Sequence, residues 1–147
     1  MGILLGFSSF FNDPTLVVSA PTTDAPGSLY IRISNMRNTK GRVSLLLFRS
    51  PVGFPDSPPS AVASRSLPVS KDGLYKFDQL PPGRYALSVI HDENENTRLD
   101  KNALGIPREG YGFSGNPKAL FGPPGFETVA FSFDGSSFEL SVKLIYW

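Results

Sequence analysis

The chain has 147 residues, with 14 basic and 13 acidic side chains and a formal net charge of +1 at pH 7. This length suits one domain with a substantial core, and the balanced charge gives no reason to expect nucleic acid or an anionic membrane surface as a partner. The absence of cysteine excludes disulfides and Cys-ligated metal sites, and the single histidine excludes a multi-histidine metal centre within one chain. No apolar run approaches the ~20 residues that a membrane-spanning helix needs, so we expect no transmembrane segment.

Residues 1–27 form an apolar, proline-containing arm ahead of the predicted domain. Its apolar run and the following Val18-Ser19-Ala20 resemble a secretory signal, but no Lys or Arg precedes Arg32, so the usual positively charged start is missing. The segment is therefore either a targeting remnant or an arm that packs on this domain or on a partner protein. The side chains that would dock are Ile3, Leu4, Leu5, Phe7, Phe10 and Phe11.

From Ser28 onward, apolar residues recur with a period of two, which is typical of strands with one buried face. The segments with this pattern are 29–34, 42–48, 73–77, 84–90, 128–133 and 137–147. Turn residues separate them, including Pro81-Pro82-Gly83 and Asp134-Gly135, and the latter predicts a hairpin. About seven short strands without a helical period predict a single antiparallel β-sandwich with Greek-key connections over residues 28–147.

Two connections are longer than this pattern needs, namely Ser50–Ser60 and His91–Gly125. Loops of this length inside a compact domain are usually functional or disordered. The second connection holds apolar residues such as Leu99 that need a place to pack, so we expect it to be ordered.

The start of this second connection gathers oxygen-bearing side chains at alternating positions, in the pattern D-x-N-x-N-x-x-x-D. Such side chains can curl around one hard cation, and calcium accepts six to eight oxygen ligands in irregular geometry. The match to an EF-hand loop is partial, because Thr97 and Ala103 stand where Gly and a bidentate Glu are usual. We therefore expect the bidentate acid to come from beyond the Gly105-Ile106-Pro107 turn. The predicted calcium ligands are Asp92, Asn94, Asn96, the carbonyl of Arg98, Asp100 and Glu109.

Other interpretations of the same connection remain open. Its Asp and Asn side chains can instead cap their own backbone in a solvated loop. His91 is either a strand-end histidine bonded to the loop that it introduces or a general base, and Ser114 has no nucleophile-elbow signature around it. Tyr111 and Phe113 either line a pocket or fold back over the edge of the sandwich.

The motifs of this region carry a family resemblance. The residues that carry it are His91, Asp92, Asn94, Asn96, Leu99, Asp100, 105–107, 109–114, 123–124, 126 and 127. Through them, the chain from about Leu29 to Tyr146 resembles a bacterial family known as domain of unknown function 2141. This resemblance implies an exported protein and gives no reaction. Separately, the segment "YKFDQLPPGRYALSV" is similar to the strand–turn–strand of transthyretin-like and carboxypeptidase-regulatory-like sandwiches, which are usually accessory or binding modules.

These features together predict a non-catalytic, extracytoplasmic binding or structural module with a calcium-type loop, of the kind that serves as an accessory subunit of a larger assembly. A protein partner would dock on the arm or on the C-terminal residues that end in Trp147. One alternative is a module that binds a small ligand or carbohydrate through Tyr111 and Phe113. Another is a hydrolase that uses a metal-bound water near His91.

Overall fold

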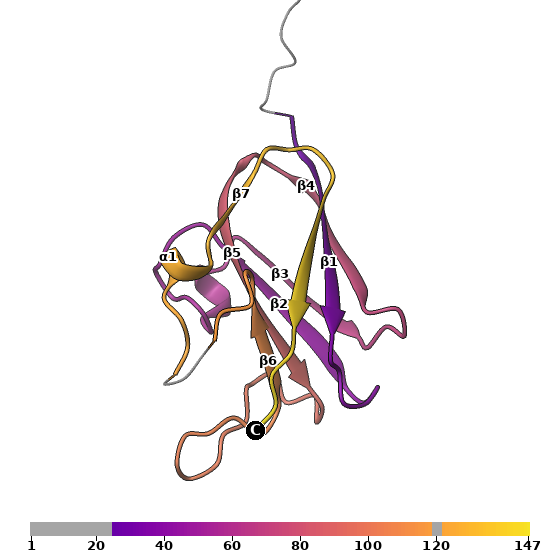
Figure 1. Cartoon of the computed structure of the whole chain (residues 1–147), viewed down its shortest axis with the longest axis vertical. Coiled ribbons are helices and arrows are strands. Elements are labelled where there is room, and N and C mark those ends of the chain that lie inside the picture. The colour runs from indigo at the N-terminus through magenta and orange to yellow at the C-terminus, as the bar shows by residue number, and fades with distance from the viewer. Residues whose placement is uncertain (1–24, 119–121) are drawn as a thin grey trace, which may run out of the picture.

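Two β-sheets pack face to face in the computed structural model, which describes residues 25–118 and 122–147 (Figure 1). Most of the predicted arm, including Ile3, Leu4, Leu5 and Phe7, lies outside the described residues. The two sheets confirm the predicted all-β sandwich, with strands at most of the expected places. In the described part of the chain, no helix is long and apolar enough to cross a membrane.

The first sheet has three strands in the order β4-β1-β8. Strand β1 (Gly27–Ser34) lies between β4 (Leu74–Leu80) and β8 (Phe138–Lys143). It pairs antiparallel with β4 but parallel with β8, so the prediction of a purely antiparallel sandwich is wrong at this pair. In this parallel pair both strands start at the same end of the sheet, with Leu29 opposite Phe138.

The second sheet has five strands, and all its pairs are antiparallel. Its central strand is β5 (Gly83–Asp92), which pairs along one edge with β2 (Arg42–Phe48). The other edge of β5 is shared by two short strands, β6 (Gly110–Phe113) and β7 (Phe131–Phe133). The outer strand of this sheet is β3 (Ala63–Pro68), which pairs with β2. The two short helices are η1 (Pro58–Ser60) and α1 (Phe126–Val129).

Three local predictions are corrected by this topology. The turn at Asp134-Gly135 is not a hairpin, because β7 pairs with β5 and β8 pairs with β1 in the other sheet. Thr128 and Val129 lie in helix α1 rather than in a strand. Strand β6 falls inside the connection that showed no strand pattern. Its glycines permit close packing, since a Cβ at Gly110 would lie 2.4 Å from the Tyr146 ring.

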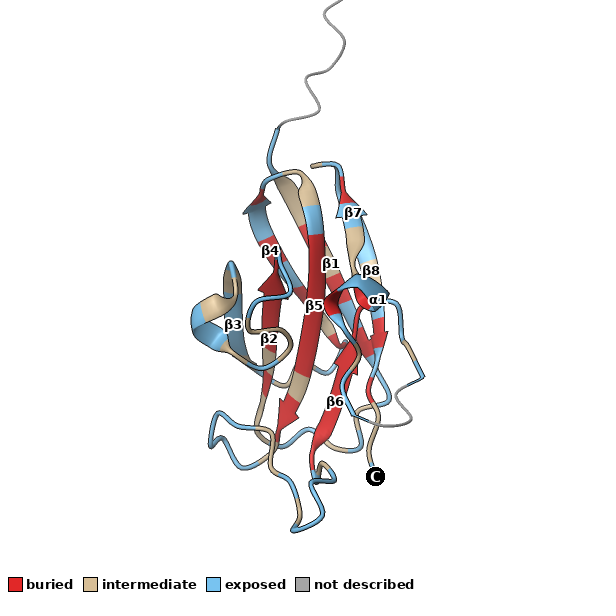
Figure 2. Ribbon diagram, turned by 90° about the vertical axis from the view of Figure 1, so that its left-hand side faces the viewer, coloured by how far each residue is buried: buried red, intermediate tan, exposed pale blue. Residues whose placement is uncertain are grey.

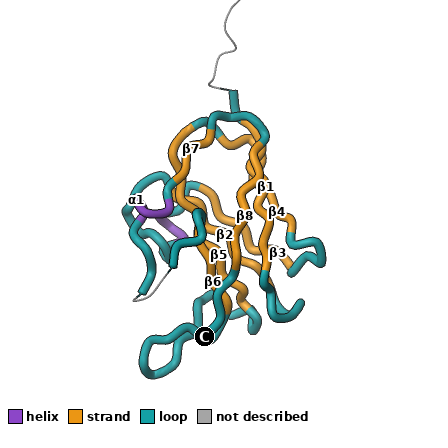
Figure 3. The backbone as a smooth tube through the Cα atoms, in the orientation of Figure 1, coloured by secondary structure: helices purple, strands orange, loops and turns teal. Residues whose placement is uncertain are grey.

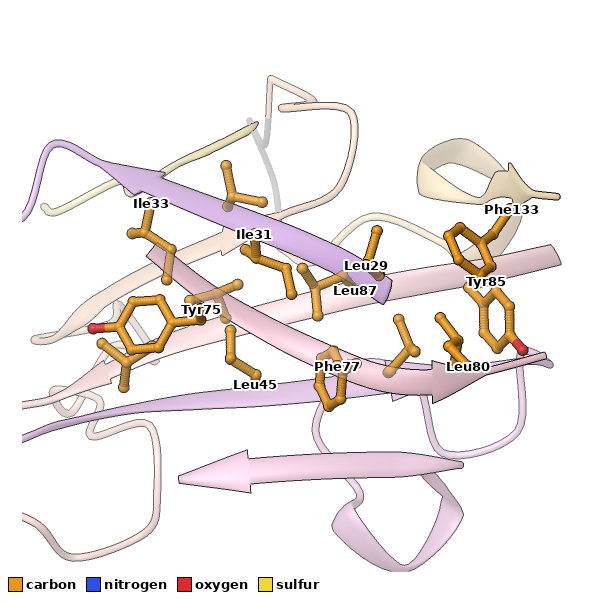
Figure 4. Close-up of a cluster of buried hydrophobic side chains, with 14 of the residues drawn as sticks. Leu29, Ile31, Ile33, Leu45, Tyr75, Phe77, Leu80, Tyr85, Leu87 and Phe133 are labelled. Atoms are coloured by element: carbon orange, nitrogen blue, oxygen red, sulfur yellow. The ribbon is translucent and has the colours of Figure 1, made fainter. Parts of the chain in front are cut away.

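The main core lies between the sheets, where the side chains of alternate residues interdigitate (Figure 4). A second apolar cluster covers the outer face of the five-stranded sheet, so β5 is buried along nearly its whole length (Figure 2). The residues of this second cluster are Leu46, Phe48, Ala86, Tyr111, Phe113, Phe126 and Val129. The part of the long connection that includes β6 therefore packs on the outer face of the sheet.

The loop between β5 and β6 projects beyond the sheets at the end of the sandwich where the C-terminus lies (Figure 3). The N-terminal end of β1 lies at the opposite end (Figure 1). The predicted calcium ligands and the C-terminal residues therefore share one end of the molecule.

Candidate functional site

The site begins where β5 ends, at the buried side chain of Asp92. Its Oδ1 accepts a hydrogen bond from the Asn96 backbone N–H at 3.1 Å, and its Oδ2 accepts one from the Thr97 N–H at 2.7 Å. Asp92 thereby folds the next five residues into a tight turn. Thr97 takes the left-handed backbone conformation (φ 66°) that glycine would adopt most easily, which explains how the turn closes without glycine at this position.

Asp100 closes the turn from the other side. Its Oδ2 accepts a hydrogen bond from Asn94 Nδ2 at 2.5 Å, and its Oδ1 accepts one from Asn96 Nδ2 at 2.7 Å. Arg98 takes part only through its backbone N–H, which donates to Asn96 Oδ1. The structure thus brings the side chains of Asn94, Asn96 and Asp100 together through hydrogen bonds.

Glu109 bonds through its side chain to the backbone at both ends of this turn. Its side chain is buried, and its two oxygens accept hydrogen bonds from the backbone N–H groups of Glu93 (3.0 Å) and Asp100 (3.2 Å). Burial raises the pKa of the Glu109 carboxyl, and the neighbouring negative charges of Asp100 and Asp92 raise it further. The carboxylate expected from beyond the turn therefore does reach the loop, in an environment that disfavours its charge.

The donor chemistry of this cluster suits a hard cation, but its arrangement is that of a hydrogen-bonded loop. Within residues 25–118 and 122–147, no group of three or more His, Cys, Asp or Glu side chains is placed to hold a metal ion. The carboxylates accept N–H groups instead, and Asn94 and Asn96 direct their amide nitrogens at Asp100. Calcium binding would require both amides to rotate and present oxygen, because a cation needs acceptor atoms only.

His91 is fully buried beside this loop and holds other segments together. Its Nε2 lies 2.7 Å from the carbonyl oxygen of Lys40, so this nitrogen must donate. Its Nδ1, 2.8 Å from the Tyr146 hydroxyl, then accepts from that hydroxyl. The expected bond to the loop after His91 is not formed, because the ring instead bridges the β1–β2 turn and the C-terminal segment.

A charged pair covers this buried histidine. The Arg37 guanidinium lies 2.6 Å from the Glu93 carboxylate and stacks 4.7 Å from the centre of the Tyr146 ring. Partial burial opposes the charge of Glu93, but hydrogen bonds from Arg37 and Asn38 hold its pKa below the usual range. His91 therefore lies behind Tyr146 and this ion pair.

Ser114 is also fully buried, and its hydroxyl is engaged on both sides. Its Oγ accepts a hydrogen bond from the Leu87 N–H at 3.0 Å and donates one to the Val129 carbonyl at 2.6 Å. This hydroxyl bonds to the backbone of β5 and α1, which explains why a serine without a nucleophile signature lies in the core.

A cavity of about 470 Å³ opens beside the loop, on the outer face of the five-stranded sheet. We call it the loop pocket. Its floor is the Ser88–Ile90 stretch of β5, and one wall holds the three aromatic residues that the sequence singled out, Tyr111, Phe113 and Trp147. The Trp147 indole N–H donates to the Tyr111 hydroxyl at 2.8 Å, which fixes the two side chains relative to each other. The remaining lining residues are Pro55, Asp56, Leu99, Lys101, Leu104, Gly105, Ile106, Pro107, Gly122 and Pro123.

The rim of the loop pocket is unusually apolar. Three of the six large apolar side chains that are exposed in the described chain line this pocket, namely Leu104 (84% exposed), Trp147 (66%) and Ile106 (38%). Grouped exposed apolar residues are typical of an interaction site. The sequence predicted that Leu104 and Ile106, like Leu99, pack against the domain, but did not assign them to a binding site. Both are exposed, so that expectation is wrong for these two residues.

Comparison with protein-family models matches residues 31–141 to the family described as "Uncharacterized protein conserved in bacteria (DUF2141)". A search of curated proteins and a search of solved structures gave no match. The family match covers most of both sheets, the whole β5–β6 loop and most of the loop pocket. The chain therefore belongs to this bacterial family, domain of unknown function 2141.

Proposed function

We propose that this protein is a non-catalytic, extracytoplasmic binding module and that the loop pocket is its binding site. The observation that carries the proposal is the convergence of Tyr111, Phe113 and Trp147 on one pocket whose rim exposes Leu104 and Ile106. Ligand pockets are mostly apolar concavities of about 300–1,000 Å³, and this one has a matching size and lining. The export and the likeness to transthyretin-like accessory modules rest on the sequence resemblance alone.

The engagement of the candidate catalytic groups supports a non-catalytic role. Both nitrogens of His91 are hydrogen-bonded within the protein, and the Ser114 hydroxyl is buried between two backbone groups. A nucleophile and a base must lie within hydrogen-bond reach of each other and of the substrate. Neither residue lines the loop pocket, so neither is placed to act on a molecule bound there.

We also propose that the β5–β6 loop binds a calcium ion, which would support the loop pocket. Asp92, Asp100 and Glu109 fix the base of the loop, while its residues Leu99, Lys101 and 104–107 line the pocket. An ion held by these oxygens would stiffen that wall, because a ligand that binds only the ordered loop favours the ordered state. The module would then present a pocket whose shape depends on calcium.

A fluorescent dye with an apolar ring system and one sulfonate charge tests the pocket directly, because Trp147 is the only tryptophan of the chain and lines the pocket. We expect anilinonaphthalene sulfonate to quench the Trp147 emission of the wild type while its own emission rises. Leu104→Asp should weaken this response by placing a charge on the rim. Val52→Asp is the matched control, since Val52 is 71% exposed and does not line the pocket. Equal dye binding by both variants would contradict the proposal.

A further inference from the structure

We infer that the loop pocket takes a small zwitterionic molecule with an apolar body, of which an apolar α-amino acid is the simplest example. This inference rests on the proposed function, because it names the ligand class of the same pocket. It follows from the polar groups that line the pocket and from the charges at its rim.

The depth of the pocket offers few free hydrogen-bonding groups. The Ser88 hydroxyl donates to the Pro55 carbonyl at 2.6 Å, and the Tyr111 hydroxyl already accepts from Trp147. A sugar would bury several hydroxyl groups here without partners, which costs free energy for each group. An aliphatic or aromatic body meets no such cost, so the walls favour an apolar ligand over a carbohydrate.

The rim carries one charge of each sign. Among the described residues that line the pocket, Lys101 and Asp56 are the only charged ones. Both are exposed, and neither forms an ion pair with any residue that the structure describes. A head group with one charge would be attracted by one of these side chains and repelled by the other. A head group with an ammonium and a carboxylate can satisfy both.

These two charges come from different connections of the fold. Asp56 belongs to the β2–β3 connection and Lys101 to the β5–β6 loop, which are the two long connections that the sequence marked as candidates for function. They line the same pocket because β2 and β5 are neighbours in the sheet. The pocket thus draws a polar rim from two loops and an apolar floor from the strand between them.

A series of four probes with the same phenyl group separates the charges. The probes are phenylalanine (both charges), phenethylamine (cation), phenylpropionate (anion) and phenylpropanol (uncharged). Binding is followed by Trp147 emission and by thermal shift, in the full-length protein. We expect phenylalanine to bind about two- to fivefold more tightly than the uncharged probe for each satisfied charge, because both rim charges are exposed to solvent.

Two variants assign each charge. Lys101→Met should remove the preference of phenylalanine over phenethylamine, and Asp56→Asn should remove its preference over phenylpropionate. Equal affinity for all four probes would overturn the zwitterion assignment while leaving the pocket as a binding site. If neither the four probes nor the dye changes the Trp147 emission, the proposed function itself is wrong. If Trp147 emission responds to a polypeptide partner and to none of the four probes, the small-molecule ligand class is overturned.

Discussion

The side chain of Ser114 takes the place of a neighbouring strand at Leu87. Strand β6 pairs with β5 as far as Ser88, and β7 pairs with it up to Tyr85, so the backbone between them has no strand partner on that edge. Ser114 fills the gap, because its Oγ accepts from the Leu87 N–H and its own N–H donates to the Leu87 carbonyl. One buried serine therefore allows two short strands to share the edge of β5.

Replacing this serine should destabilise the fold. Ser114→Ala leaves the Leu87 N–H and the Val129 carbonyl without their partner in a dry environment, and each unsatisfied buried group costs about 1–3 kcal/mol. The free energy of unfolding, from urea denaturation, measures the loss. Ser136→Ala is the control, because Ser136 is exposed and bonds only to Asp134. Equal stability of the two variants would show that Ser114 does not complete the sheet.

The buried His91 should depend on the hydroxyl of Tyr146. Tyr146→Phe removes the donor to Nδ1 and leaves that nitrogen as an unsatisfied acceptor, for a loss of about 1–3 kcal/mol. Tyr30→Phe provides the comparison, because the Tyr30 hydroxyl bonds to no residue that the structure describes. Chemical denaturation of both variants checks this. A negligible effect of Tyr146→Phe would mean that water replaces the hydroxyl.

Calcium should raise the melting temperature, and a chelator should lower it. An ion that binds only the folded loop stabilises it by mass action. Asp100→Asn should remove this difference because it replaces a carboxylate at the centre of the cluster, while Asp134→Asn, in an exposed turn, should retain it. Differential scanning fluorimetry is sufficient. An identical melting curve in millimolar calcium and in chelator would contradict the calcium proposal.

Without calcium, stability should rise as the pH falls from neutral toward 4.5, the ordinary pKa of a glutamate. The raised pKa of the buried Glu109 means that the folded state binds its proton more tightly than the unfolded state does. The stabilisation is therefore complete below the unfolded pKa and is lost as the pH rises through the folded pKa. At lower pH the trend reverses, because the lowered pKa values of Glu93 and Asp134 are those of carboxylates that stabilise the fold when charged.

Glu109→Gln is the variant that isolates this effect. The substitution removes the titrating group, so the rise in stability between neutral pH and about 4.5 should disappear. Urea denaturation across this pH range, in chelator, gives the measurement. A variant with the same pH profile as the wild type would assign the effect to another group.

The N-terminal arm should be dispensable for folding. The described residues already form two packed sheets with a buried core, so deletion of residues 1–20 should leave the melting transition in place. The apolar side chains of the arm, at ~25 cal/mol per Å² of apolar area, should instead stabilise association with a partner or a second copy. Sedimentation of the full and shortened chains reports this. Loss of the folded state on deletion would place the arm in the core.

Local sequence patterns determined where most of the strands lie and which side chains bond to one another inside the β5–β6 loop. The period of two fixes which face of a strand is buried, whatever its partner is. The bonds of Asp92, Asn94, Asn96 and Asp100 are made among residues less than ten positions apart, so local spacing is enough to bring them together. The sequence predicted them as oxygen ligands of one ion, whereas the structure joins them by hydrogen bonds. The sequence also predicted the sandwich, because seven or so such strands without helices have few other ways to bury their apolar faces.

Only the tertiary structure decided which strands pair and what the loop faces. The parallel pairing of β1 with β8 and the pairing of β7 with β5 join segments from opposite parts of the chain, and no local pattern specifies a partner. Strand β6 has four residues and two glycines, so its extended form depends on hydrogen bonds from β5 and Ile145. The loop pocket exists for the same reason, because Asp56, Lys101 and Trp147 are brought together by pairing between distant strands and not by their spacing in the sequence.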